Sequence, residues 1–437
     1  MTTASRFLDR IRATLGEPTA MYTVADAFAA RGAHARAFSL FVDAAQSGLP
    51  QAQFRLGRCY FQGLGVPPCL SEALRWFRRA AEAGNAGAQT QLAELVLEGI
   101  RDQPSSGLFD GPDFGSDFER AEHWCRQAIT GGSAEAKALL GFILTHGPVE
   151  RRDPKAARAL YREAAAAGWA RGQVGLALAL LSDETAEGAA EAQALLSAAA
   201  TGGAAVAHHL LGVLLESGAA GAVDIEAAAS HYKVAAELGY TAAQVRYGFA
   251  LLHGRGVAPD AFSAETWLRR AGLAGDPQAA AVVGYLYARE GDLPPNFAEA
   301  AMWLRRAAEA GHMAAARTLS RILLMGNGVA KDVAEAAWWL RQAAADGDGE
   351  ARAELLRLTL TRQLDGDAEH AVIELLQTAA EAGDPEAEYD LGLCLSQGIG
   401  VIQNCQAALE WICRSAKDGF PDATRMVAQM MAEAHPA

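Results

Sequence analysis

Ser230 and Lys233 have the spacing of a catalytic pair. They lie in the motif SHYK (230–233), and a lysine three residues after a serine can activate it as a nucleophile. The KTG and SDN motifs that accompany this pair in serine acylases do not follow it. The repeat pattern described below also places SHYK inside a helix. We therefore predict no catalytic residues and no enzyme activity.

Histidines and cysteines are the candidate metal ligands. His208, His209 and His231 fall in one repeat, but adjacent residues of a helix point about 100° apart, so the first two cannot easily bind one ion. The 6 cysteines have no disulfide-framework spacing and are expected to be small buried hydrophobes. No HExxH motif occurs, and no GxG turn is followed by GK[ST]. The sequence predicts neither a metal nor a cofactor.

The composition excludes several classes of protein. The chain has 437 residues, a net charge of −14 and 51% hydrophobic residues, which is too apolar for a disordered chain. An acidic protein is a poor ligand for nucleic acid or for anionic membranes. No run of 18 apolar residues could span a bilayer, and charged residues interrupt the first 18 positions. We expect a cytoplasmic protein with no nucleic-acid partner and no membrane insertion.

A period of about 36 residues organises the chain. Glycines recur at 48, 84, 132, 168, 203, 239, 275, 311, 347, 383 and 419, with one 12-residue insertion and one deletion. An apolar residue follows each glycine by eight positions, and a small residue precedes that one by four. The residue after the apolar one, such as Gly57, is nearly always small, which predicts close contact between helices. Each unit therefore contains a first helix with an apolar face.

A second helix in each unit carries a large ring beside a small residue. Tryptophan recurs on it at Trp76, Trp124, Trp267, Trp303, Trp339 and Trp411. N-cap residues precede it at Asp153, Asp224, Asp260, Asn296, Asp332 and Asn404, and Glu299 and Glu335 are placed to complete capping boxes. The periodic glycine fits the left-handed position that ends this helix. The GxGV segments at 63–66, 254–257, 326–329 and 398–401 predict the turn between the two helices.

This combination of Leu-Gly, GxGV, Ala-x-x-Trp and a final Gly resembles the Sel-1-like repeat, which is related to the tetratricopeptide repeat. The resemblance covers about residues 16–437, while the units at 168–203 and 347–383 lack the GxGV turn and carry Leu195 and Leu375 at the tryptophan site. It implies an all-α, right-handed superhelical solenoid of about ten 36-residue helix-turn-helix repeats. We expect one elongated domain, with a capping segment at 1–15 and a C-terminal capping helix at about 422–434.

The inserted loop at 101–117 is one candidate binding site. It is rich in Gly, Pro, Ser and Asp and carries three large apolar residues, Leu108, Phe109 and Phe114. Such a loop either folds back onto its own scaffold or contacts a partner. The sequence leaves both alternatives open.

The face of the first helices that is turned away from the Ala52, Leu56 and Tyr60 stripe is the other candidate, and the resemblance implies that first helices line the concave side of the solenoid. The central repeats carry large apolar residues there, and a later repeat carries two arginines: Val174, Leu178, Leu181, Val245, Phe249, Leu252, Tyr285, Arg317 and Arg321. An apolar strip would suit an amphipathic helix or an extended peptide. Alternatively, neighbouring first helices pack more tightly and bury these positions. Charged residues on the same face could orient a partner or form a solvated surface: Arg55, Arg246, Glu354 and Asp390.

The function that the resemblance implies is a protein-protein interaction scaffold or adaptor. We expect it to bind a partner protein or peptide on its concave surface and inserted loop, in bacterial-type signalling or complex assembly. The alternative is a regulatory or assembly subunit of an enzyme or of an envelope-polysaccharide or secretion complex. Some relatives are linked to penicillin binding, but no residue pattern here supports hydrolysis. A monomer is compatible with this reading.

Overall fold

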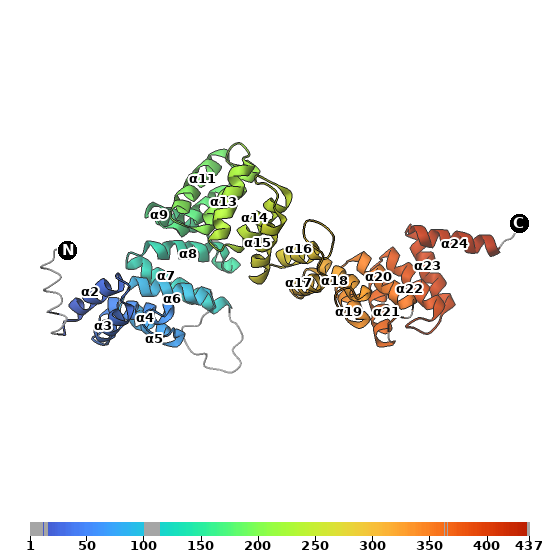
Figure 1. The fold of residues 1–437 in the computed structure, drawn as a ribbon, viewed down its shortest axis with the longest axis horizontal. Coiled ribbons are helices and arrows are strands. Elements are labelled where there is room, and N and C mark those ends of the chain that lie inside the picture. The colour runs from blue at the N-terminus through green and yellow to red at the C-terminus, as the bar shows by residue number, and fades with distance from the viewer. Residues whose placement is uncertain (1–11, 13–15, 100–113, 362, 365, 435–437) are drawn as a thin grey trace. The chain divides into compact units, whose positions relative to one another are not determined.

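The computed structural model describes residues 12, 16–99, 114–361, 363–364 and 366–434. All regular secondary structure in these residues is helical, which confirms the predicted all-α solenoid class (Figure 1). The chain forms two compact units, Met1–Asp224 and Ile225–Ala437, and each is described by itself below.

Unit 1 contains alternating first and second helices, each packed on the next along the chain. These are α2 (Pro18–Ala29), α3 (His34–Gln46), α4 (Pro50–Gln62), α5 (Leu70–Glu82), α6 (Ala86–Leu97), α7 (Phe114–Thr130), α8 (Ala134–His146), α9 (Pro154–Ala166), α10 (Ala170–Leu181), α11 (Ala186–Thr201) and α12 (Ala205–Ser217). A short 3₁₀ turn, η1 (Val149–Arg151), precedes α9. The first helix α8 also contacts the first helices α6 and α10.

Unit 2 continues the alternation. Its helices are α13 (Ile225–Glu237), α14 (Thr241–His253), α15 (Ala261–Leu273), α16 (Pro277–Tyr287), α17 (Phe297–Glu309), α18 (Met313–Met325), α19 (Val333–Ala345), α20 (Gly349–Leu360), α21 (Gly366–Glu381), α22 (Pro385–Gln397), α23 (Cys405–Lys417) and α24 (Pro421–Ala434). The helices α10, α11, α20 and α21 form despite the missing turn and tryptophan in their repeats.

The periodic glycines end second helices as predicted. All eleven have positive φ, for example 84° at Gly132 and 87° at Gly239. A Cβ atom built on any of them would meet no atom within 4 Å. The backbone conformation, and not a lack of room, therefore requires glycine at these positions.

The second glycine of the GxGV turn has a different role. Gly65 has a φ of 81°, and a Cβ there would lie 2.5 Å from the carbonyl oxygen of His34. The turn after α4 is thus pressed against the start of α3, the second helix of the preceding repeat. The turn joins two repeats as well as two helices.

Close helix contact at the small position is confirmed. A Cβ on Gly57 would lie 2.6 Å from Cδ1 of Phe77, and one on Gly284 would lie 2.6 Å from Cγ of Leu304. In both places a side chain of the second helix fills the space that the glycine leaves. Larger residues there would force the two helices apart.

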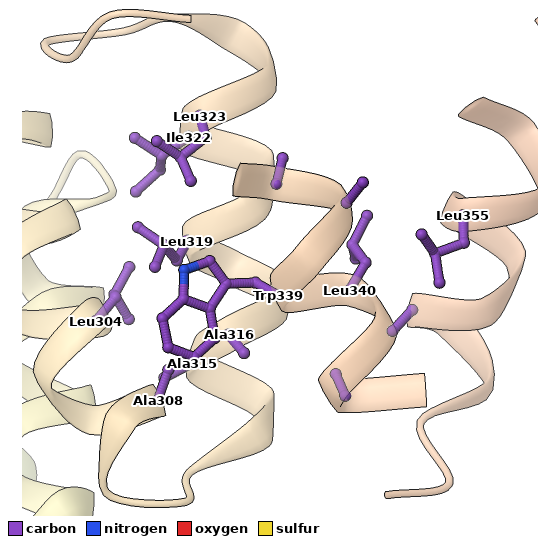
Figure 2. Packing of buried hydrophobic residues seen from close by; sticks show 14 of the residues in the cluster. Leu304, Ala308, Ala315, Ala316, Leu319, Ile322, Leu323, Trp339, Leu340 and Leu355 are labelled. Atoms are coloured by element: carbon purple, nitrogen blue, oxygen red, sulfur yellow. The ribbon is translucent and has the colours of Figure 1, made fainter. Parts of the chain in front are cut away.

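Three tryptophans of the second helices, Trp76, Trp303 and Trp339, lie in the core as predicted, whereas Trp124, Trp267 and Trp411 are half-buried. Trp303 and Trp339 are 2% and 6% exposed. Figure 2 shows the Trp339 ring packed against α18, beside Ala315, Ala316 and Leu319. A ring opposite small side chains produces the dense packing that excludes water from this core.

Predicted N-caps form at Asp153, Asp260, Asn296, Asp332 and Asn404, but the predicted capping boxes are only half formed. Asn296 accepts the Glu299 backbone N–H at 3.2 Å, and Asp332 accepts that of Glu335 at 2.8 Å. The return bond from the glutamate does not form, because the N-cap N–H already donates to the preceding first helix, from Asp332 to Leu323 O at 3.1 Å. Each glutamate side chain is therefore available for other bonds.

The predicted irregular segments have different outcomes. Leu108, Phe109 and the capping segment 1–15 except Arg12 lie outside the described residues. The loop was expected to extend to 117, but α7 already begins at Phe114, with Asp117 in its first turn, where an acidic residue favours a helix N-terminus. The predicted C-terminal helix is α24, and its role as a cap stays a prediction.

Candidate functional site

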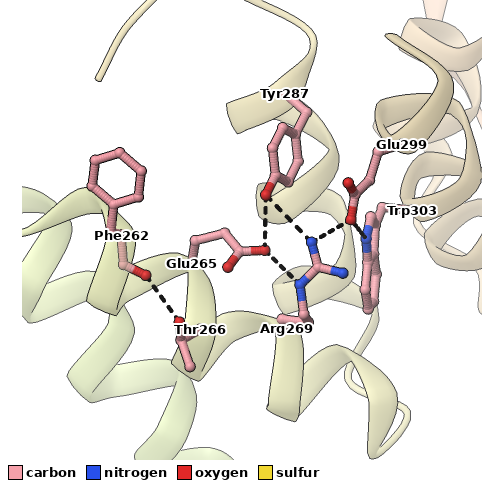
Figure 3. Close-up of polar contacts among 7 residues, drawn as sticks. All are labelled: Phe262, Glu265, Thr266, Arg269, Tyr287, Glu299 and Trp303. Carbon is pink, nitrogen blue, oxygen red and sulfur yellow. Dashed lines mark hydrogen bonds and ion pairs between the residues drawn. The ribbon is translucent and has the colours of Figure 1, made fainter. Parts of the chain in front are cut away.

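Arg269 on α15 is the centre of a polar cluster in unit 2 (Figure 3). Its Nε donates to Glu265 at 2.6 Å, and its Nη2 donates to Tyr287 at 3.3 Å and to Glu299 on α17. The Trp303 Nε1 also donates to Glu299, at 3.4 Å. Burial opposes the charge of Arg269, but the hydrogen bonds that Arg269 donates to Glu299 and Glu265 outweigh the effect of burial and raise the pKa of the guanidinium. The cluster is therefore an ion-paired connection between repeats.

The same connection recurs one repeat later. Arg305 donates to both carboxylate oxygens of Glu335, at 2.7 and 3.0 Å, and Trp339 donates to Glu335 at 3.1 Å. The next arginine in the series is Arg341, where the following repeat has Ala371 and Leu375 in place of the glutamate and the tryptophan. The Nε of Arg341 is buried and has no hydrogen-bond partner among the described residues. Arg269 and Arg305 therefore join the second helices of consecutive repeats, and the corresponding glutamate contact is missing at Arg341.

In unit 1, the candidate surface is divided between core and solvent. Val174 is buried in the core, so the tighter-packing alternative accounts for it. Leu178 is 45% exposed, and Leu181 is half-buried. The neighbouring helix α8 adds Phe142, which is 43% exposed and stacked on His146 with ring centroids 4.5 Å apart. Sequence analysis missed Phe142, although it occupies the same repeat position as Leu178.

In unit 2, the candidate side chains are half-buried. Val245, Leu252 and Tyr285 pack against the core from α14 and α16 without being enclosed by it. Phe249 is also half-buried and stacks on His253, at 6.0 Å between centroids and 22° between planes. Burial raises the pKa of the Tyr285 hydroxyl, so this group stays neutral and acts as a hydrogen-bonding group. The four residues present apolar area that a partner could cover.

The two candidate arginines differ. Arg317 forms ion pairs with Asp348 at 3.1 Å and with Glu350, which join α18 to the start of α20. Arg321 is exposed and forms no ion pair or hydrogen bond within the described part of the chain. Only Arg321 therefore has a guanidinium free for a partner.

Other charged residues on this face are not all solvated. Arg55 pairs with Asp26, and Glu354 pairs with Arg357 at 3.1 Å. Asp390 is only 6% exposed, which corrects its expected position on the surface.

The residues considered for catalysis or metal binding are spread over the helices of several repeats. Ser230 and Lys233 are both exposed on α13. Among the described residues, no group of three or more His, Cys, Asp or Glu side chains is arranged to hold a metal ion. Cys59, Cys125 and Cys394 are buried as expected, but Cys405 and Cys413 are exposed because they lie on the solvent side of α23. No described helix has the length and apolarity needed to cross a membrane.

The helices stack in pairs, a glycine with positive φ follows the second helix of each pair, and the GxGV turn contacts the preceding repeat. These features define an α-solenoid repeat protein. The Sel1 repeat model matches residues 50–85, 107–133, 134–169, 205–240, 241–276, 277–312, 314–348 and 385–420, well over half of the chain. This chain therefore belongs to the Sel1 repeat family. The unmatched stretches after 169 and after 348 hold two of the repeats that lack the turn and the tryptophan.

Similar proteins share the repeats. A solved structure of c5321, a protective antigen of uropathogenic Escherichia coli with this fold, has a TM-score of 0.55 and 25% identity, covering 91% of this chain and 83% of that one. Chitin synthase regulatory factor 3 of Schizosaccharomyces pombe is 32% identical over 34% of this chain, and the match covers 15% of that protein. The Sel1-repeat-containing protein YjcO of Escherichia coli is 35% identical over 26% of this chain and 42% of its own length. The chain thus spans less than half of these two curated relatives.

Proposed function

We propose that this chain is a non-catalytic, cytoplasmic scaffold that binds a partner protein through the first-helix face of unit 2. One observation carries the proposal: Val245, Phe249, Leu252 and Tyr285 present half-buried apolar area from α14 and α16, and the unpaired Arg321 lies on the next first helix. Membership of a family of interaction scaffolds supports it.

The chemistry of this face defines the partner. An amphipathic helix with one apolar side would cover the Phe249 and Tyr285 rings, and aromatic side chains often dominate such interfaces. An acidic residue at the edge of that helix would pair with Arg321. We therefore propose an acidic amphipathic segment of a partner protein as the ligand.

The test is a double variant, Phe249→Asp with Tyr285→Asp, in the full chain. We expect loss of the partner that cross-linking and mass spectrometry identify with the wild-type chain, because two carboxylates would be buried against apolar side chains. Phe262→Asp on α15 is the matched control, because Phe262 is 65% exposed and lies on a second helix. Circular dichroism must show unchanged helix content.

Two outcomes would contradict the proposal. If the double variant unfolds while Phe262→Asp does not, these side chains serve the core, as the packing alternative holds. If the double variant folds and captures the same partner as the wild type, the binding face lies elsewhere.

A second candidate is a regulatory subunit of an enzyme complex. It is favoured by the similarity to a protein named as a regulatory factor of chitin synthase, although the match covers a small part of that protein. The same cross-linking experiment distinguishes the two, because a regulatory subunit would be captured with an enzyme.

A further inference from the structure

A pocket at the start of unit 1 lies apart from the surface proposed above. It has a volume of about 220 Å³ and is lined by the ends of α2 and α3, by one face of α4 and by the turn that follows α4. Its walls are apolar, with Phe41, Ala37, Cys59 and Leu64 among the lining residues. Two guanidinium groups and one imidazole complete the lining, those of Arg55, Arg58 and His34.

The two arginines have different states of pairing. Arg55 is held by the ion pair with Asp26 and lies over the Phe41 ring, with Cζ 5.8 Å from the centroid. Its Nε is buried and has no hydrogen-bond partner among the described residues. Arg58 is half-buried and forms no hydrogen bond or ion pair within the described ranges. The pocket therefore has a net positive charge and unused N–H donors, in a chain whose net charge is −14.

No other first helix has this pair of side chains. The positions equivalent to Arg55 and Arg58 are Gln91 and Glu94 in α6, Leu139 and Phe142 in α8, and Arg246 and Phe249 in α14. Residues that vary where the repeat is otherwise regular are candidates for a specific function. The pocket is thus a particular feature of the first repeats.

The size and charge of the pocket restrict its ligand. Sites for whole drug-sized molecules have volumes of about 300–1,000 Å³, so this pocket accommodates part of a larger ligand. Guanidinium donors select a carboxylate, and the apolar walls select a hydrocarbon side chain beside it. The chain's own segment 1–15 is a poor occupant, because its three arginines and one aspartate give it a positive charge.

We propose that this pocket binds the C-terminal residue of a partner peptide, with an apolar side chain on the walls and the terminal carboxylate on Arg58, beside the positive charge of Arg55. A C-terminal residue carries both groups on one Cα. Neighbouring side chains of an extended internal segment point to opposite sides, so an internal acidic residue and its apolar neighbour would not enter one small pocket together.

The test uses the full chain and a fluorescein-labelled pentapeptide, Gly-Gly-Ser-Gly-Leu, with either a free or an amidated C-terminus. We expect the free acid to bind and amidation to weaken it about tenfold or more in fluorescence anisotropy, because charged hydrogen bonds are lost. Arg58→Gln should weaken the free acid by a similar factor, and Arg58→Lys by less. The matched control is Arg36→Gln, an exposed arginine of α3 outside the pocket.

Several results would overturn the proposal. Equal binding of the acid and the amide would show that the terminal carboxylate makes no contact with Arg58. The same conclusion would follow if Arg58→Gln had no effect in a chain with a normal circular dichroism spectrum. If sodium acetate displaced the labelled peptide as effectively as unlabelled peptide does, the apolar walls would not contribute to binding. The Phe249→Asp and Tyr285→Asp variant should bind the pentapeptide normally, which separates this site from the surface of unit 2.

Discussion

Glu335 illustrates how one residue can serve a different role from the one its position suggests. Its spacing from Asp332 predicted a capping box, and its backbone N–H does bond to the cap. Its carboxylate instead joins Arg305 of the preceding repeat to Trp339. The 36-residue recurrence of the arginine and of the glutamate was a signal of this contact, but the local capping rule explained the glutamate first.

Trp339 should contribute strongly to the stability of unit 2. We expect Trp339→Ala to lower the free energy of unfolding by about 3–5 kcal/mol, because it leaves a cavity in the core and removes the bond to Glu335. The adjacent Trp338 is 43% exposed and provides the matched control, with an expected loss below about 1 kcal/mol. Urea unfolding followed by circular dichroism measures both, and equal losses would show that the ring is not in the core.

Asp390 should make stability depend on pH. Burial, with the neighbouring charge of Glu386, raises the pKa of this carboxyl to about 7, against an ordinary value of 3.8. Between these values the folded state keeps a proton that the unfolded chain releases, so Asp390 reduces stability increasingly as the pH rises from about 4 to 7, and fully above that.

Asp390→Asn removes this dependence. We expect the variant to exceed the wild type in stability at pH 8, by at most about 4 kcal/mol, and to equal it near pH 4. The difference between the two unfolding free energies, measured from pH 4 to 8, isolates Asp390 from other titrating groups. A difference that is flat with pH would refute the raised pKa.

At the scale of the helix, the close contact between the first and second helices of a repeat depends on a glycine in the first helix, which has no side chain. Gly284→Ala should lower the free energy of unfolding by about 1–3 kcal/mol, although alanine favours helices, because the new Cβ would lie 2.6 Å from Leu304. Gly349→Ala is the matched control, since its nearest atom would be 3.8 Å away. We expect no loss there, and thermal unfolding of both variants provides the comparison.

The helices and their ends could be predicted from the sequence because they repeat. Glycine recurs at eleven fixed positions, and the N-cap residues and the tryptophans each recur at six, so many copies reinforce each local rule. The surface could not be predicted as well. Val174 and Leu178 lie one turn apart on α10, and only the packing of α10 against its neighbours buries the first and exposes the second. The pocket at Arg58 was missed because its walls come from three helices and a turn.

At the scale of the whole chain, the contacts run mainly between neighbours in sequence. Stability in such an array is a sum over repeats and the interfaces between them, so each substitution above acts on its own repeat and the adjoining ones. The same organisation allows separate sites along one chain, and the two proposed here lie in different units. Each can be lost without the other.

The periodic glycines have a consequence for the array as a whole. They have open space around them and positive φ, so chirality, and not volume, disfavours L-residues with a Cβ at these positions. A D-alanine introduced by chemical synthesis would fit where L-alanine is strained. The most regular residue of this sequence therefore marks the turn from each second helix to the next first helix, and its handedness is fixed by the backbone alone.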